Sequence, residues 1–267
     1  MEANLFELFR RRASATPDRP AIIHRGGRVT YAELLVRVER RASALRRRGV
    51  GKGERVVVFV PMSIALYEIL LAVFAVGAVA VFIDAWADSR RLDHAASLAE
   101  AKAFVAIPKA WLLLLKSKAL RRIPVRLLPG FGRSSRGDGP FTAADCTPDD
   151  PALVTFTTGS TGVPKAALRT CGFLYAQHRA LKAALGVRDD DVDLATLPIF
   201  ALNNLACGIV TLIPDFNPAK PAEFDAEKVA AVERKAALIG YSRLMRRLIR
   251  RGGLETEQGR KEIETYK

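Results

Sequence analysis

The chain has 267 residues, of which 49% are hydrophobic, so it can bury a substantial core in one large or two small domains. Its net charge of +14 favours attraction to anionic substrates or surfaces. Aromatic residues make up only 7% of the chain and do not interleave with the basic clusters, which argues against a nucleic-acid binder. Cys146, Cys171 and Cys207 have no metal-ligand spacing, and the first residues lack a signal peptide's pattern, so we expect a cytoplasmic protein.

Helical and strand-like patterns alternate along the chain, which predicts an α/β fold with a parallel sheet built from βαβ units. Helices are predicted at residues 5–15, 32–48, 63–76, 90–100, 109–115, 171–185 and 226–235. Strands are predicted at residues 21–24, 55–60, 78–83, 103–106, 125–128, 152–156 and 193–195. The glycine- and serine-rich segment 130–140 is predicted to link two βα halves of one domain.

Basic residues cluster on the predicted helix 32–48 and again at residues 242–251. Apolar residues form one face of that helix, so Arg40, Arg41 and residues 46–48 are predicted to lie on a solvated outer face. The stretch 242–251 is amphipathic and basic. It fits an anionic membrane surface or an anionic protein partner.

Residues 64–83 are almost continuously apolar and match the length of a membrane-spanning helix. Glu68 interrupts the run, and after Gly77 the pattern changes from helix-like to strand-like. We therefore predict a helix at 63–76 followed by a buried parallel strand at 78–83, with a membrane span as the alternative.

The histidines and a group of aspartates are candidate metal ligands by residue type alone. His24, His94 and His178 lie far apart without metal-binding spacing, so we interpret them as surface or packing residues. Thr170 precedes the helix that carries His178 and is predicted to cap it. The aspartates within 189–193 are predicted to form a solvated turn, and no metal ligand is predicted.

The most informative segment is residues 153–165, in which an apolar strand runs into a loop of hydroxyls and glycines ending in Pro164 and Lys165. Glycines allow backbone N–H groups to turn toward an anion, hydroxyls add donors, and a lysine adds a compact positive charge. This composition suits a triphosphate. The predicted phosphate-binding residues are Thr157, Thr158, Gly159, Ser160, Thr161, Gly162 and Lys165.

Two common nucleotide-binding motifs do not fit this loop. A Walker A loop needs glycine and lysine adjacent with a serine or threonine next, whereas Val163 and Pro164 separate Gly162 from Lys165 here. The dinucleotide-binding fingerprint lacks the hydroxyl cluster. A plain surface loop remains the alternative for any such cluster.

The ordered string of strand, hydroxyl–glycine loop, proline and lysine resembles the phosphate loop of the adenylate-forming (AMP-binding) superfamily. Further segments similar to that family follow in its order at residues 4–6, 17–22, 29–34, 49–56 and 77–84. Within the family, the sequence in and around the loop is most similar to olefin β-lactone synthetases and fatty-acyl-CoA ligases. The segments that carry this similarity are residues 103–110, 155–162, 165–170 and 197–206.

The resemblance implies an ATP-dependent acyl-adenylating ligase that activates a fatty or β-hydroxy carboxylic acid with ATP and Mg²⁺. It implies that Lys165 contacts the β- and γ-phosphates and that Thr158, Ser160 and Thr161 donate hydrogen bonds to them. Many relatives carry an aromatic–histidine pair where this chain has Phe200 and Ala201. Because that histidine helps to shape the acyl and thioester tunnel, its absence favours the lactone-forming branch over ordinary CoA ligation.

The family's later motifs are not found after Asp215: the Tyr-Gly-x-Thr-Glu segment, the Thr-Gly-Asp segment and the C-terminal domain with its catalytic lysine. We therefore expect residues 1–215 to be a partial, truncated N-terminal AMP-binding domain and residues 216–267 a basic helical tail. No catalytic residue is assigned. The expected partner is the missing C-terminal part or another chain, and the alternatives are a non-catalytic remnant and a basic module that binds a membrane surface.

Overall fold

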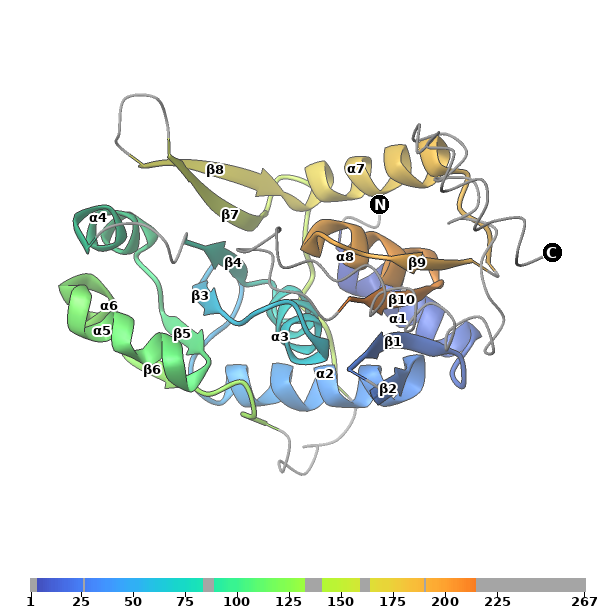
Figure 1. Cartoon of the computed structure of the whole chain (residues 1–267), viewed down its shortest axis with the longest axis horizontal. Coiled ribbons are helices and arrows are strands. Elements are labelled where there is room, and N and C mark those ends of the chain that lie inside the picture. The colour runs from blue at the N-terminus through green and yellow to red at the C-terminus, as the bar shows by residue number, and fades with distance from the viewer. Residues whose placement is uncertain are drawn as a thin grey trace, which may run out of the picture.

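The computed structural model describes residues 4–25, 27–83, 89–132, 141–158, 164–189 and 191–214. These residues form a six-stranded and a four-stranded β-sheet with helices packed around them (Figure 1). The predicted helix 226–235, the basic stretch 242–251 and the whole of the expected tail 216–267 lie outside the described residues.

The larger sheet has the strand order β6-β5-β3-β4-β7-β8. It is parallel from β6 to β7, and β8 pairs antiparallel with β7 at the edge. Its strands are β3 (Arg55–Phe59), β4 (Val79–Phe82), β5 (Ala103–Ala106), β6 (Val125–Leu127), β7 (Pro151–Thr158) and β8 (Pro164–Thr170). The predicted parallel sheet of βα layers is thus confirmed.

The smaller sheet joins the beginning of the described chain to its end, in the order β2-β1-β10-β9. Its strands are β1 (Pro20–His24), β2 (Gly27–Thr30), β9 (Val192–Leu194) and β10 (Val210–Ile213). β1 runs parallel to β10, with Ile22 beside Thr211, and antiparallel to β2. The chain therefore leaves the smaller sheet after β2, builds the larger one and returns.

The helices are α1 (Leu5–Ala15), α2 (Tyr31–Arg46), α3 (Ile64–Ala75), α4 (Ser89–Ala99), α5 (Leu113–Lys116), α6 (Lys118–Arg122), α7 (Cys171–Leu185) and α8 (Pro198–Cys207), with a 3₁₀ helix η1 (Pro108–Leu112). α1 and α7 have the predicted bounds. The predicted helix 109–115 is divided between η1 and α5, and α6 and α8 were not predicted.

Two apolar cores lie on opposite faces of the larger sheet, because successive strand residues point to opposite sides. On β3, Val56 and Val58 enter the core shared with α1, α2, α3 and α8, whereas Val57 and Phe59 enter the core covered by α4 and α6. The helices α4, α5 and α6 lie at the left of Figure 1, away from α1 and α8. Burial on both faces accounts for the continuous apolar strands of this sheet.

The apolar run 64–83 is a buried helix followed by a buried strand, as predicted. Ser63 caps α3 by accepting a hydrogen bond from the Leu66 N–H at 3.3 Å. Gly77, with φ of 71°, turns the chain into β4. Across the described residues, the structure contains no helix that meets the length and hydropathy needed for a membrane crossing.

The predicted solvated face of α2 is wrong at one residue. Arg40 and residues 46–48 are exposed as predicted, but Arg41 is 0% exposed and packs against Glu68 of α3. The sequence pattern places a charged residue on the surface by default, whereas a buried carboxylate on a neighbouring helix reverses that preference.

The three strands that were not predicted have weak local signals. β10 is a run of four residues that are all buried, too short to separate from a buried helix by periodicity. β8 begins with Pro164 and Lys165, and β2 begins at Gly27; such residues usually mark loops. Each becomes a strand by pairing with a longer neighbour.

Candidate phosphate-binding site

The strands on either side of the hydroxyl–glycine segment, β7 and β8, form a two-stranded hairpin. β7 and β8 pair antiparallel from Pro151 opposite Thr170 to Thr158 opposite Pro164, which brings Lys165 opposite Thr157. The hairpin projects from the edge of the larger sheet (Figure 1). The sequence prediction of a strand ending at 156 was therefore short by two residues.

The structure describes three of the seven predicted phosphate-binding residues. Thr157 and Thr158 end β7, and Lys165 is the second residue of β8. Gly159, Ser160, Thr161 and Gly162 lie outside the described residues. The pairing of β7 with β8 nevertheless fixes where the ends of that segment leave and rejoin the sheet.

One face of the hairpin is polar and carries positive charge. Residues 165, 167 and 169 of β8 share a face because side chains alternate along a strand. Lys165 is exposed, and Arg169 donates from Nη1 to Thr155 Oγ1 across the hairpin at 2.8 Å. Neither β7 nor β8 contains an acidic residue. This face therefore attracts anions.

Arg169 and Thr155 are not among the predicted phosphate-binding residues. The signal that could have found them is the two-residue alternation Lys165, Ala167, Arg169, which points all three side chains to one face only if the segment is a strand. That strand was not predicted, so the shared face of Lys165 and Arg169 was not predicted either.

The base of the hairpin leads directly into α7. Thr170 caps this helix, accepting a hydrogen bond on Oγ1 from the Phe173 N–H at 3.2 Å, as predicted. The Cys171 N–H donates to the Asp150 carbonyl at 2.8 Å, and the Gly172 N–H donates to the Pro148 carbonyl at 2.8 Å. Backbone hydrogen bonds thus hold the start of β7 against the first turn of α7.

Behind the hairpin, α7 and α8 share buried polar side chains. His178 is 8% exposed, and its Nδ1 lies 2.9 Å from Asn203 Oδ1. Burial lowers the pKa of His178, although the Asn203 hydrogen bond opposes this effect. The packing role predicted for this histidine is confirmed. Among the described side chains, Gln177 Oε1 and Asn203 Nδ2 are buried without a hydrogen-bond partner.

The predicted solvated turn of aspartates is wrong for two members. Asp191 is 2% exposed and accepts from the Arg188 N–H at 2.8 Å, while Asp193 is 9% exposed on β9 and accepts from Asn204 Nδ2 at 2.7 Å. Burial raises the pKa of Asp193, opposed by the Asn204 hydrogen bond. The sequence missed this because α8, which supplies Asn204, was not predicted.

The described residues contain no group of three or more His, Cys, Asp or Glu side chains placed to hold a metal ion. This covers His178, Asp191 and Asp193, which make separate hydrogen bonds. His178 with Asn203, and Asp193 with Asn204, form buried hydrogen-bonding pairs.

Comparison with known proteins identifies relatives that match most of this chain. The sequence profile of the AMP-binding enzyme family matches residues 9–255. The chain is 34% identical over 244 residues to an olefin beta-lactone synthetase of Xanthomonas campestris and 33% identical over 211 residues to a feruloyl-CoA synthase of an Amycolatopsis species. These alignments cover 82% and 76% of this chain.

A solved structure shares the fold. ATP-bound MatB from Rhodopseudomonas palustris superposes with a TM-score of 0.71 at 24% identity, covering 83% of this chain and 47% of MatB. The chain spans less than half the length of the curated relatives named above, at 43% of the lactone synthetase and 40% of the feruloyl-CoA synthase. The profile match, together with the hairpin and its parallel sheet, shows that this chain belongs to the AMP-binding family of adenylate-forming enzymes.

Proposed function

We propose that this chain takes part in ATP-dependent acyl adenylation, in which a carboxylate attacks the α-phosphorus of ATP and pyrophosphate leaves. The supporting observation is the β7–β8 hairpin, which presents an acid-free, cationic face beside the hydroxyl–glycine segment. That segment follows the carboxyl end of a parallel strand, where open α/β sheets bind ligands.

Six of the seven predicted residues have a part in this proposal. Lys165 contacts the β- and γ-phosphate oxygens as a compact charge, and Thr158, Ser160 and Thr161 donate hydrogen bonds to the same group. Gly159 and Gly162 let backbone N–H groups approach. Negative charge grows on these oxygens as pyrophosphate departs, so donors that are already oriented stabilise the transition state.

ATP fits the donor set of the hairpin, since Lys165 and Arg169 lie on one strand and neither strand adds a carboxylate. Among the described residues, no group of three or more acidic, histidine or cysteine side chains gathers that could by itself hold the Mg²⁺ implied by the family resemblance. We therefore assign no step to a metal ligand of this chain.

We propose a fatty or β-hydroxy acid as the carboxylate substrate, with capture by an internal hydroxyl preferred over capture by CoA. Ala201, which stands where many relatives carry a histidine, is 0% exposed on α8 and belongs to the main core. A methyl group there leaves no imidazole to shape a thioester tunnel. The 34% identity to a lactone synthetase supports the same preference.

Pyrophosphate release with a panel of fatty and β-hydroxy acids tests the adenylation proposal. We expect no release from the 267-residue chain alone and release once a chain that carries the family's later motifs is added. Lys165→Ala should then reduce release at least about tenfold, as removing a transition-state donor does. Release that is insensitive to Lys165→Ala contradicts the proposal. ATP binding without release in any combination supports the non-catalytic alternative.

The acceptor is tested in the same reconstituted enzyme. We expect a long-chain 2-alkyl-3-hydroxy acid to outperform the plain fatty acid, with product formation independent of CoA. Strong thioester production from the plain fatty acid and CoA would refute the lactone preference.

We also propose that the protein binds an anionic lipid surface, through an acid-free basic segment. Residues 101–132 contain lysine and arginine but no aspartate or glutamate. Within them Leu112 and Leu115 are 60% and 76% exposed, and Lys116, Lys118 and Arg121 beside them are exposed. Exposed leucines flanked by cations suit a bilayer with anionic headgroups.

Co-sedimentation with anionic and with zwitterionic vesicles tests this surface. Binding should need anionic lipid, weaken with salt and fall in Leu112→Ser/Leu115→Ser. Leu197→Ser, at an exposed leucine outside the segment, is the control. Equal binding by the double variant, or binding only to nucleic acid, contradicts the proposal.

A further inference from the structure

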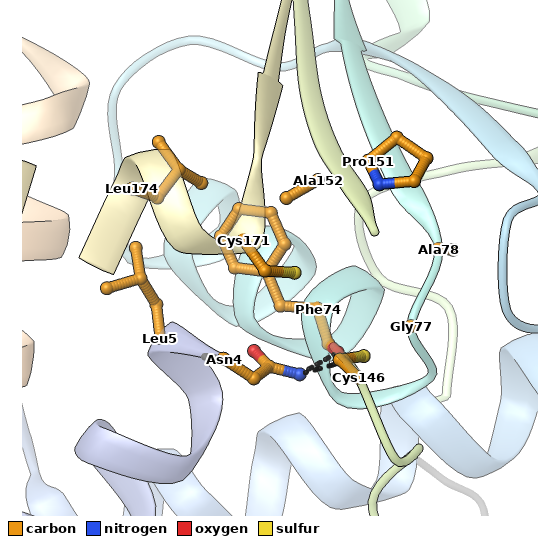
Figure 2. A pocket seen from close by; sticks show the side chains of 10 residues that line it. All are labelled: Asn4, Leu5, Phe74, Gly77, Ala78, Cys146, Pro151, Ala152, Cys171 and Leu174. Atoms are coloured by element: carbon orange, nitrogen blue, oxygen red, sulfur yellow. Dashed lines mark hydrogen bonds between the residues drawn. The ribbon is translucent and has the colours of Figure 1, made fainter. Parts of the chain in front are cut away.

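Two of the three cysteines line one small cavity. Cys146 and Cys171 line the same cavity of about 10 Å³, together with Asn4, Phe74 and Gly77 among others. Figure 2 shows Cys146 entering from the segment before β7 and Cys171 from the first turn of α7. The space holds at most one water molecule, so it is too small for an organic ligand.

The backbone keeps these thiols close. The hydrogen bonds from Cys171 N–H to Asp150 and from Gly172 N–H to Pro148 fix residues 148–150 against the start of α7. Cys146 is two residues away from Pro148. Its Sγ accepts from Asn4 Nδ2 at 3.6 Å, and the same amide donates to the Phe74 carbonyl at 2.8 Å. The Cys146 side chain is thereby held in the shared space.

Glycine at residue 77 leaves room for the Cys146 sulfur. A Cβ at this position would lie 3.3 Å from Cys146 Sγ, and the φ of 71° disfavours any other residue. The sulfur therefore packs directly on the backbone turn between α3 and β4.

The surroundings of the two sulfurs make them chemically unequal. A hydrogen bond from the Cys171 thiol lowers the pKa of Cys146 to about 7, against the opposing effects of burial and of Asp150; Lys52 adds a favourable charge. The pKa of Cys171 is raised by its hydrogen bond to Cys146 and by burial. Cys146 is also half-buried whereas Cys171 is buried. Cys146 is thus the accessible thiolate.

We propose that Cys146 and Cys171 are a redox-active dithiol that closes to an intramolecular disulfide by exchange with a low-molecular-weight disulfide. The inference goes beyond acyl adenylation and needs no nucleotide. It assigns the attacking role to Cys146 and the resolving role to Cys171.

The exchange balances in two steps. The Cys146 thiolate attacks one sulfur of the oxidant, breaks its S–S bond and releases one thiolate, leaving a mixed disulfide on Cys146. The loss of negative charge at Cys146 lets Cys171 give its proton to solvent. Cys171 then attacks the Cys146 sulfur and releases the second thiolate. One oxidant disulfide is reduced to two thiols, and two protein thiols are oxidised.

The bond would close a ring from residue 146 to residue 171, and this ring contains the whole β7–β8 hairpin with the segment 157–165. Oxidation therefore restrains the base of the candidate phosphate-binding site from both sides. Such a ring stabilises the folded chain by limiting the unfolded one.

The test is titration of the full chain with oxidised glutathione, followed by thiol counting in denaturant and peptide mapping. Wild type and Cys207→Ser should each lose two thiols and yield a peptide pair joining Cys146 to Cys171. Cys171→Ser should stop at one glutathione on Cys146, and Cys146→Ser should react at least about tenfold more slowly. Cys207 is the matched control because it is buried on α8.

The pH dependence of the first step separates a paired dithiol from two ordinary thiols. In wild type the rate should rise with an apparent pKa of about 7. Cys171→Ala removes the donor and should move this midpoint upward, with Lys52 and Asp150 unchanged. Stable glutathionylation of wild-type Cys146, a disulfide to Cys207, or an unshifted midpoint in a variant with native circular dichroism would each overturn the proposal.

Discussion

The guanidinium of Arg41 is buried against the carboxylate of Glu68, joining α2 to α3 beneath the larger sheet. Arg41 Nε donates to Glu68 Oε2 at 2.9 Å, and its Nη2 donates to the same oxygen. Arg41 Nη1 also donates to the Phe131 carbonyl at 2.9 Å, and both charged side chains are 0% exposed. The pair therefore ties two helices to the segment after β6.

Removing one partner of this pair should be costly, because it leaves the other charge buried. We expect Glu68→Gln to lower the free energy of unfolding by about 3–5 kcal/mol. Glu7→Gln, which breaks the partly exposed pair between Glu7 and Arg10, should cost at most about 1 kcal/mol. Urea denaturation of both variants gives the comparison. Equal losses would show that the Arg41–Glu68 contact is no tighter than a surface pair.

Lys165 should dominate whatever affinity the chain has for nucleotide. We expect isothermal titration of the 267-residue chain with Mg-ATP to show weak binding, because its sequence lacks the family's adenine and ribose motifs. Lys165→Ala should abolish that signal, while Lys116→Ala, at an exposed lysine of α5, should not. Sub-micromolar binding by wild type would contradict the expectation of weakness, and full binding by Lys165→Ala would contradict the assignment.

Protonation of His178 should destabilise the fold. Burial lowers its folded-state pKa below the ordinary 6.5, so the unfolded chain binds the proton more readily. Stability should therefore fall as the pH drops through 6.5 toward the folded-state pKa and level off below it. His178→Gln should flatten this slope, whereas His94→Gln, at an exposed histidine, should leave it unchanged. Chemical denaturation at a series of pH values measures the slope; an identical slope in all three proteins contradicts the prediction.

Gly172 should be intolerant of any side chain. A Cβ there would lie 2.9 Å from the Pro148 carbonyl oxygen, a backbone atom that cannot move without breaking the hydrogen bond at the base of the hairpin. We expect Gly172→Ala to destabilise the protein by about 1–3 kcal/mol despite the better helix propensity of alanine. Gly51→Ala meets no atom within 4 Å and should change stability by less than about 0.5 kcal/mol. Thermal denaturation of both variants measures the two changes in stability. If Gly172→Ala does not change stability, the contact between the new Cβ and the Pro148 carbonyl oxygen relaxes at no cost, which contradicts the prediction.

The composition of the candidate site was predictable because its residues lie close together in the sequence. The loop glycines, the hydroxyls and Lys165 all lie within residues 157–165, so their composition alone indicated anion binding. The parallel strands β3, β4 and β5 were predictable for the same reason, since each is a short apolar run between turn residues. The role of Arg169 was not predictable, because its neighbour Thr155 is fixed by the pairing of β8.

The sequence by itself determined the family and the parallel sheet and predicted the phosphate-binding segment, because each depends on residues close together in the chain. Only the tertiary structure decided that Arg41 is buried on Glu68, that Asp193 meets Asn204, and that Cys146 shares a cavity with Cys171. From the sequence alone, a charged or polar residue is predicted to be solvent-exposed, because the partner that would allow its burial is not known. Those partners come from elements distant in sequence, and packing alone brings them within hydrogen-bonding distance.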